Sequence, residues 1–266
     1  MLDIDFAEVS DPGKTRDHNE DYIGHVTADT EARVRSHGWL FALADGVGGQ
    51  ECGEVASREA VETILTGFRK APGGEPHIGL LTRLVQAANI RVYESGRAAS
   101  PGGTSMATTV VTCAIRFDRA VVAHVGDSRC YLIRHGRAKQ LTRDHTVVND
   151  QLRLGILNAR EAAEHQNKHL LSRSLGGDLF VNADLNEAQI LPGDALLLCS
   201  DGFHGALPEA QIGNIVNNLS DTGMAAARLV QLANDLDGSD NISVQLIRVR
   251  NVERMGMYRG RPYKLR

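Results

Sequence analysis

Short apolar runs and amphipathic stretches alternate along the first part of the chain. Three runs of alternating or continuous apolar residues, a pattern typical of β-strands, cover residues 4–9, 22–26 and 39–44. Next come two stretches in which apolar side chains recur every three or four positions, and this spacing predicts helices that bury one face. They cover residues 61–68 and 81–92, with the helix breaker Pro72-Gly73-Gly74 between them.

The second part of the chain begins with closely spaced runs that predict strands at residues 108–117, 120–125, 130–134 and 138–141. Connections this short favour antiparallel pairing. Residues 145–169 have an irregular, polar helical pattern, which predicts a mobile insertion over the sheet, with Arg153 and Arg160 among its polar residues. The remaining pattern predicts strands at residues 180–185, 195–199 and 242–249, and helices at residues 209–218 and 224–236.

The order of these elements indicates the fold class. Strands come in runs and helices in pairs, without strict alternation, which favours an α+β fold with helices on the outer faces of packed sheets. We predict one catalytic domain over residues 1–250 and a basic C-terminal tail over residues 251–266. The tail has five basic residues, one acid and no apolar period. We expect a frayed terminus there, with a docking role as the alternative.

Composition and charge narrow the classes of function. Of the 266 residues, 42% are hydrophobic and 23% charged, which excludes a disordered or fibrous chain. The apolar runs fall far short of the ~18 residues that span a bilayer, so we expect no membrane span and a cytoplasmic protein. A net charge of −4 gives no positive field for nucleic acid. The four cysteines form no CxxC pair, and we expect reduced thiols in the core.

Four aspartates share a position at one end of an apolar strand: Asp45, Asp127, Asp201 and Asp240. Any one of them, next to a glycine, is ordinary turn chemistry. Four together weaken that interpretation, because a carboxylate at the end of a buried strand is costly unless something compensates its charge. A divalent cation would do so. Oxygen ligands suit Mg²⁺ or Mn²⁺, and the absence of a Cys/His cluster in the sequence argues against zinc.

An ordered set of motifs then becomes apparent from about residue 5 to residue 250. The sequence resembles the metal-dependent type 2C (PPM-type) protein serine/threonine phosphatases, most closely their compact bacterial members. A lone ADG would be weak evidence, but the set occurs in family order. The matching segments are SDPGKTRDHNED (10–21), ALADGVGG (42–49), GEVAS (53–57), GTSMATT (103–109), HVGDSRCYLIRHG (124–136), LTRDHT (141–146), SRSLGG (172–177), LLLCSDG (196–202) and GSDNISV (238–244).

The resemblance implies a fold and a set of metal ligands. The fold would be two antiparallel sheets packed face to face with helices outside, an αββα sandwich. Asp45 would bridge two metals, with the carbonyl of Gly46 on the first. Asp201 and Asp240 would bind the second metal. Asp127 with Asp201 would hold a third, weaker ion. The implied cofactors are Mn²⁺ or Mg²⁺, as two core ions with a third weaker one.

Other matching residues are implied to handle water and phosphate. Glu20 and Asp21 match acids that orient metal-bound waters, and Arg16 matches the phosphate-binding arginine. Three metal-binding aspartates would leave two divalent ions with a residual charge of about +1, enough to bind a bridging hydroxide and then a phosphoryl oxygen. Arginine can pair bidentately with the equatorial phosphoryl oxygens. Val47 departs from members that have a histidine there, which leaves the proton donor for the leaving group open.

The leading hypothesis is a monomeric hydrolase that dephosphorylates phosphoserine and phosphothreonine in phosphorylated proteins, in signal transduction, opposing a cognate bacterial serine/threonine kinase. A second hypothesis is a catalytically silent phosphoprotein-binding module, whose mark would be a lost metal aspartate. A third is a hydrolase of small phosphate esters or nucleotides, whose mark would be a Walker-type loop. The sequence keeps every aspartate of the set and has no GxxxxGK[ST] motif, so both alternatives are weaker.

Overall fold

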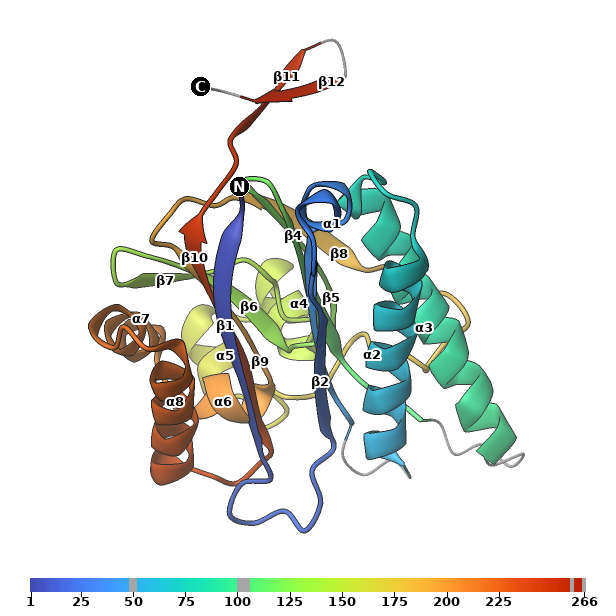
Figure 1. Ribbon diagram of the computed structural model, residues 1–266. Coiled ribbons are helices and arrows are strands. Elements are labelled where there is room, and N and C mark those ends of the chain that lie inside the picture. The colour runs from blue at the N-terminus through green and yellow to red at the C-terminus, as the bar shows by residue number, and fades with distance from the viewer. Residues whose placement is uncertain (48–51, 100–105, 259–260, 265–266) are drawn as a thin grey trace.

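Two five-stranded antiparallel sheets pack face to face in the computed structural model, which describes residues 1–47, 52–99, 106–258 and 261–264 (Figure 1). In order across the first sheet, the strands are β1 (Asp3–Asp11), β10 (Ile242–Asn251), β9 (Ala195–Cys199), β6 (Arg129–Arg134) and β7 (Arg137–Gln140). Across the second they are β2 (Asp21–Val26), β3 (Trp39–Asp45), β4 (Val110–Arg116), β5 (Arg119–Val125) and β8 (Asp184–Gln189).

The space between the sheets is filled by alternate side chains of the inner strands. Phe41 and Leu43 of β3 meet Leu196 and Leu198 of β9 in one buried cluster. Because strand side chains alternate between faces, the intervening residues point outward to the helices. Ala42 and Ala44, for example, belong to the cluster under the helices of the second sheet.

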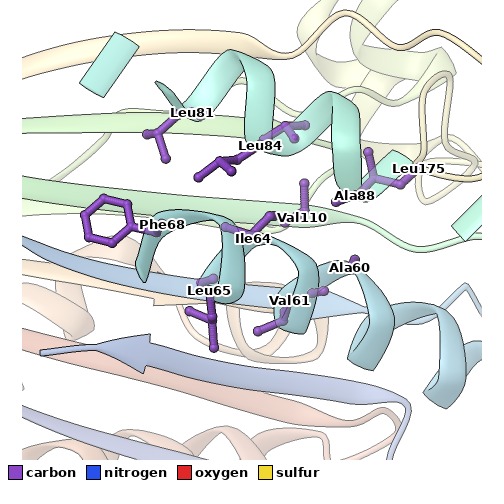
Figure 2. Packing of buried hydrophobic residues seen from close by; sticks show 14 of the residues in the cluster. Ala60, Val61, Ile64, Leu65, Phe68, Leu81, Leu84, Ala88, Val110 and Leu175 are labelled. Carbon is purple, nitrogen blue, oxygen red and sulfur yellow. The ribbon is translucent and has the colours of Figure 1, made fainter. Parts of the chain in front are cut away.

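Two long helices, α2 (Gly53–Lys70) and α3 (His77–Ala99), cover the second sheet (Figure 2). Their apolar positions recur at helical spacing, so one face of each is buried. Gly67 allows the two helices to approach closely, because a Cβ there would lie 2.3 Å from Leu84 Cδ2. On the first sheet, α6 (Asp201–Ala206), α7 (Glu209–Asn218) and α8 (Thr222–Leu236) take the same place. The predicted αββα sandwich is confirmed.

Two local features differ from the sequence pattern. The sequence pattern missed the short helix α1 (Glu31–Ser36). The strand expected at residues 180–185 is β8, about four residues later, where the pairing of Arg119 with Gln189 through His124 with Asp184 sets the register. Phe180 suggested a strand by its type, but 77% of it is exposed and it lies before the paired segment. Edge strand β8 is mostly exposed, so it lacks the apolar alternation that would have marked it.

The C-terminal tail is not simply frayed. Strand β10 continues to Asn251, and β11 (Met255–Tyr258) pairs antiparallel with β12 (Arg261–Lys264), beyond the body of the sandwich (Figure 1). Backbone pairing between two short strands needs no apolar period, and for that reason the sequence pattern did not reveal it. Residues 48–49 and 103–105, at the ends of two matched segments, lie outside the described residues.

All four cysteines are free, and Cys113, Cys130 and Cys199 are buried as expected, whereas Cys52 is exposed. Within the described part of the chain, none of the helices combines the length and the apolar character needed to span a bilayer.

Candidate active site

The four aspartates singled out in the sequence meet at one end of the sandwich. Asp45 is the last residue of β3, Asp127 follows β5, Asp201 opens α6 after β9, and Asp240 precedes β10. All four line one cleft of about 660 Å³ together with Arg16, Glu20 and Gly46. The two sheets contribute to the same cleft because the ends of their strands converge there. Residues from five separate segments of the chain are thereby brought together.

The backbone of Asp45 is held by two threonines, Thr108 and Thr109, that the sequence analysis did not predict as site residues. Its N–H donates to Thr109 Oγ1 at 3.0 Å. Its carbonyl accepts from the Thr109 N–H at 2.8 Å and from Thr108 Oγ1 at 2.7 Å. These bonds leave the carboxylate free for the cleft while its main chain stays in place.

Gly46 follows at a point where three segments come very close. A Cβ at Gly46 would lie 2.5 Å from the Gly53 carbonyl at the start of α2, so only glycine fits without moving that backbone. The Gly46 N–H donates to the Glu20 carbonyl at 3.1 Å. A Cβ at Gly53 would in turn lie 3.0 Å from the Glu20 carboxylate. Glu20, Gly46 and the start of α2 thus form one tight wall of the cleft.

Asp21 is the one predicted site residue that does not line the cleft. It is opposite Asp45 in the β2–β3 register and is only 7% exposed. Its Oδ2 accepts a hydrogen bond from Ser200 Oγ at 2.7 Å, whereas its Oδ1 is buried with no hydrogen-bond partner in the described structure. Burial, with Asp201 and Asp240 nearby, raises the pKa of Asp21 to about 7. The carboxylate therefore lies behind the cleft surface.

Burial and mutual repulsion make this cleft unfavourable for negative charge. Burial raises the pKa of Asp45 well above its usual range, and the carboxylates around it add to the effect. Burial, with Asp201 close by, raises the pKa of Asp127 to about 8. The pKa values of Asp201 and Glu20 are raised for the same main reason. A cation among these groups would reverse the repulsion.

The residues present fit divalent metal ions. The cleft offers carboxylate and carbonyl oxygens, the donors that Mg²⁺ and Mn²⁺ prefer, and the uncompensated Oδ1 of Asp21 lies behind it. His169 is a further donor that the sequence analysis missed. One ligand atom each from Asp127, His169 and Asp201 lie within 4.8 Å of one another. No matched segment includes His169, so no signal in the sequence singled it out.

Arg16 is at the rim of the cleft and is 43% exposed. Its Nη2 donates to Asp240 Oδ2 at 2.8 Å. The guanidinium thus lies beside one of the aspartates predicted to bind metal, at the rim through which a phosphate would enter the cleft.

The insertion, residues 145–169, forms a flap beside the cleft. Arg153 and Arg160, the flap residues expected to contact the substrate, are not the ones next to the aspartates. Its helices are α4 (Val147–Arg153) and α5 (Ala159–Glu164). Neither Arg153 nor Arg160 lines the cleft, and Arg160, 86% exposed, pairs with Glu164 along α5. The wall next to the aspartates is made by the segment after α5, which contributes His169, Leu170, Leu171, Ser174 and Gly177.

Comparisons with known proteins agree with this architecture. Residues 14–237 match the family model of protein phosphatase 2C. The serine/threonine phosphatase stp of Listeria innocua is 33% identical over 257 residues, which cover 95% of this chain and 96% of that protein. Protein phosphatase PhpP of Streptococcus pneumoniae is 30% identical over 251 residues, covering 92% of this chain and 97% of that protein.

Solved structures show the same likeness. The serine/threonine phosphatase of S. agalactiae superimposes with a TM-score of 0.84 at 31% identity, covering 92% of this chain and 99% of that one. The catalytic domain of the serine threonine protein phosphatase PstP, solved with two manganese ions, gives 0.79 at 31% identity, covering 94% of this chain and all of that one. The chain belongs to the protein phosphatase 2C family. It is accordingly a metal-dependent protein phosphatase, a phosphoric monoester hydrolase of the bacterial serine/threonine phosphatase type.

Proposed function

We propose that this enzyme removes phosphate from phosphoserine and phosphothreonine side chains of proteins through the cleft lined by the four aspartates. One observation carries the proposal: Asp45, Asp127, Asp201 and Asp240, from four strand ends, line the same cleft as Arg16. Carboxylates placed together need cations, and the guanidinium at the rim suits a phosphate. An open rim, with Arg16 43% exposed, suits a side chain presented on a protein.

The assignment of ligands is the one that the family resemblance implies, and the presence of all five residues in one cleft supports it. Asp45 and the Gly46 carbonyl would hold the first ion, with Asp45 shared by the second. Asp201 and Asp240 would complete the second ion, and Asp127 with Asp201 would hold the third. Mn²⁺ or Mg²⁺ fits these oxygen donors. The PstP structure, solved with two manganese ions, supports the number of core ions.

Bound divalent ions would supply two things, a lowered pKa for a coordinated water and charge stabilisation of the phosphoryl oxygens. The protein supplies the rest. Arg16 binds two phosphoryl oxygens through its planar guanidinium, which requires it to turn from Asp240. Glu20, at the wall of the cleft, and Asp21, whose unpartnered Oδ1 is buried behind Asp45, would orient metal-bound waters by hydrogen bonding.

We further propose that the enzyme opposes a serine/threonine kinase in the cytoplasm and acts as a monomer. Its four free thiols support a reducing compartment. Sedimentation would show the monomer as a particle with the mass of one chain.

The direct test is hydrolysis of a phosphothreonine peptide with Mn²⁺ present and after chelation, with Asp201→Asn as the control variant. Release of phosphate only with metal and only by the unchanged chain supports the proposal. Binding of the peptide without release would favour the silent module. Hydrolysis of p-nitrophenyl phosphate without hydrolysis of any phosphopeptide would favour an enzyme for small esters.

A further inference from the structure

Asp127 is in a short loop between β5 and β6 whose backbone shape is unusual. Gly126, just before it, has a φ of +101°, and a Cβ there would lie 2.6 Å from Thr109. A side chain at this position would be strained, so the turn requires glycine. The contacts of the neighbouring segments with this loop therefore bear on where the Asp127 carboxylate points.

Two histidines from distant segments contact this loop from two sides. The Gly126 N–H donates to His145 Nδ1 at 3.2 Å, and the Gly126 carbonyl accepts from the His145 N–H at 3.0 Å. On the other side, His204 Nε2 is 3.0 Å from the Asp127 carbonyl oxygen. Three of the four backbone polar groups from Gly126 N–H to Asp127 C=O are therefore bound by two residues.

These contacts determine the tautomer of each ring. A backbone N–H can only donate, so His145 Nδ1 must be unprotonated and its proton must be on Nε2. A carbonyl can only accept, so His204 Nε2 must carry a proton. Burial, with His124 and Arg173 nearby, lowers the pKa of His145 to about 4, which agrees with a neutral ring. At Nε2 of His145, the Asp184 carboxylate 3.4 Å away accepts such a proton, whereas Arg173 Nη1, also 3.4 Å away, can only donate and makes no hydrogen bond with this tautomer.

His145 is itself held at the base of the flap. Its Nε2 is 3.4 Å from Asp184 Oδ2, and Asp184 also accepts from Arg143 at 2.7 Å and from Arg173 at 3.0 Å. The carbonyl of His145 accepts from the Ser172 N–H at 2.9 Å. Both ends of the flap thus meet at the residue that holds Gly126.

The same cluster is a poor metal site, although His124, His145 and Asp184 offer ligand atoms within 4.8 Å of one another. Two guanidiniums already contact the Asp184 carboxylate and would repel a cation. The rings of His124 and His145 stack at 4.8 Å between centroids with an interplanar angle of 14°, so their nitrogen lone pairs do not converge on one ion. The cluster acts through hydrogen bonds.

We propose that His145 and His204 are positioning residues that clamp the Gly126–Asp127 loop and so aim the Asp127 carboxylate into the cleft. The role of Asp127 as a ligand of the third ion rests on the proposed function, but the clamp itself is a property of the metal-free protein. His145 also couples the loop to the flap, because its backbone carbonyl accepts a hydrogen bond from the N–H of Ser172, just after the flap.

The first test is imidazole ¹⁵N NMR of the unchanged, metal-free protein, which does not depend on activity. Both rings should be neutral, His145 with its proton on Nε2 and His204 likewise. A proton on Nδ1 of either neutral ring overturns the clamp, because the contact to the loop would then join two donors or two acceptors.

The second test exchanges each ring for the amide that reproduces one of its nitrogens. Asparagine places an oxygen near the position of Nδ1, and glutamine places an NH₂ near Nε2. His145→Asn should therefore keep the bond from Gly126, whereas His145→Gln should lose it. The order reverses at the other residue, where His204→Gln should keep the bond to Asp127 and His204→Asn should lose it.

The readout is hydrogen exchange of the Gly126 amide for His145 and the Mn²⁺ affinity of the weakest site for both residues. Gly126 should exchange at least about tenfold faster in His145→Gln than in His145→Asn. Weakest-site affinity should fall about threefold to tenfold in His145→Gln and His204→Asn, and should be unchanged when Asp127 is already replaced by asparagine. Equal behaviour of both amides at either position overturns the proposal. If the variants fail to fold, the tautomers in the unchanged protein decide.

Failure of the proposed function would be visible separately. A chain that hydrolyses no phosphopeptide but shows the predicted tautomers and exchange rates keeps the clamp and loses the phosphatase assignment. A chain that hydrolyses phosphopeptides with the opposite tautomers keeps the function and loses the clamp.

Discussion

Asp45, Asp127, Asp201 and Asp240 form the acidic floor of the cleft. This floor and the flap beside it are built in opposite ways. Asp45 and Asp127 are at the ends of buried strands, and the backbone of Asp45 alone makes three hydrogen bonds to Thr108 and Thr109. The flap has two helices of seven and six residues, and α5 has no buried residue. Leu154 and Ile156, between those helices, are 67% and 64% exposed.

We propose that this difference separates chemistry from recognition. Groups that must hold cations need fixed positions, and strand ends anchored in a sandwich core provide them. A surface that must accept different protein substrates can be less stable, because few buried contacts resist its local opening. We therefore expect substitutions in the floor to lower turnover on every substrate, and substitutions in the flap to discriminate between substrates.

The largest effect is expected in the floor. Asp201→Asn should lower kcat at least about 100-fold on any phosphate ester, because it removes a full charge from the predicted cation site. Asp240→Asn should act in the same direction. The fold should persist, which circular dichroism and thermal unfolding would check. Turnover near that of the unchanged chain at saturating Mn²⁺ would contradict the two-metal assignment and, with it, the chemical role of the floor.

A smaller effect is expected at the rim. Arg16→Ala should lower kcat/KM about 10-fold to 100-fold, the cost of one lost charge-assisted contact to phosphate. Metal affinity, measured by calorimetry, should stay within about threefold, because Arg16 contributes no ligand. Arg16→Lys serves as the control that keeps the charge and loses the planar fork. Lost metal binding in Arg16→Ala would instead mean that the contact with Asp240 organises the floor.

The electrostatic strain of the floor should appear in the stability of the metal-free protein. Asp127 in the folded chain has a pKa of about 8, far above its value near 3.8 in the unfolded chain. Between those values the folded state binds more protons than the unfolded state, so stability falls as pH rises. From pH 7.5 to 8.5, above the titration range of unfolded histidines, Tm should drop by about 2 °C, roughly 0.7 kcal/mol at this size.

Controls for this drop use the floor and the surface. Asp127→Asn should reduce it, and Mn²⁺ should abolish it, because each removes the uncompensated charge. Asp235→Asn, at an exposed helix position, should leave the drop unchanged. A Tm that rises with pH in the metal-free protein would show that these carboxylates are not held in an unfavourable environment.

The smallest effect is expected at the flap wall. Leu170, 56% exposed, lines the cleft, so Leu170→Ser should lower kcat/KM on phosphopeptides about threefold to tenfold by removing part of an apolar contact. On p-nitrophenyl phosphate, which is too short to reach the flap, the change should stay within about twofold.

Leu154→Ser is the matched control, an exposed leucine of the flap that does not line the cleft. Leu154→Ser should leave kcat/KM unchanged on both substrates, and the same holds for Arg153→Ala and Arg160→Ala. If Leu170→Ser lowered kcat/KM equally on the phosphopeptide and on p-nitrophenyl phosphate, this wall would support the floor of the cleft instead of contacting the substrate.

Much of the candidate site could be predicted from the sequence because its residues are marked locally. An aspartate beside a glycine at the end of an apolar run is visible without coordinates, and Asp45, Asp127 and Asp201 have that mark, whereas Asp240 has its glycine two residues earlier. His169 has no such mark, and it joins the cleft only because the chain after α5 returns beside Asp201. Arg153 and Arg160 show the converse error, because polarity on a helix does not tell whether the side chain meets a site or solvent.

The sequence by itself determined the periods of strands and helices, and hence an α+β fold with helices on packed sheets, since burial of apolar faces follows from local spacing. Its ordered motifs, through the family resemblance, implied the αββα sandwich and the carboxylates predicted to bind cations. Tertiary structure alone decided the start of β8, the pairing of β11 with β12, the position of Asp21 behind Asp45, and the two histidines that hold Gly126 and Asp127. These features depend on register and on contacts between segments far apart in the chain, and neither leaves a periodic trace in the sequence.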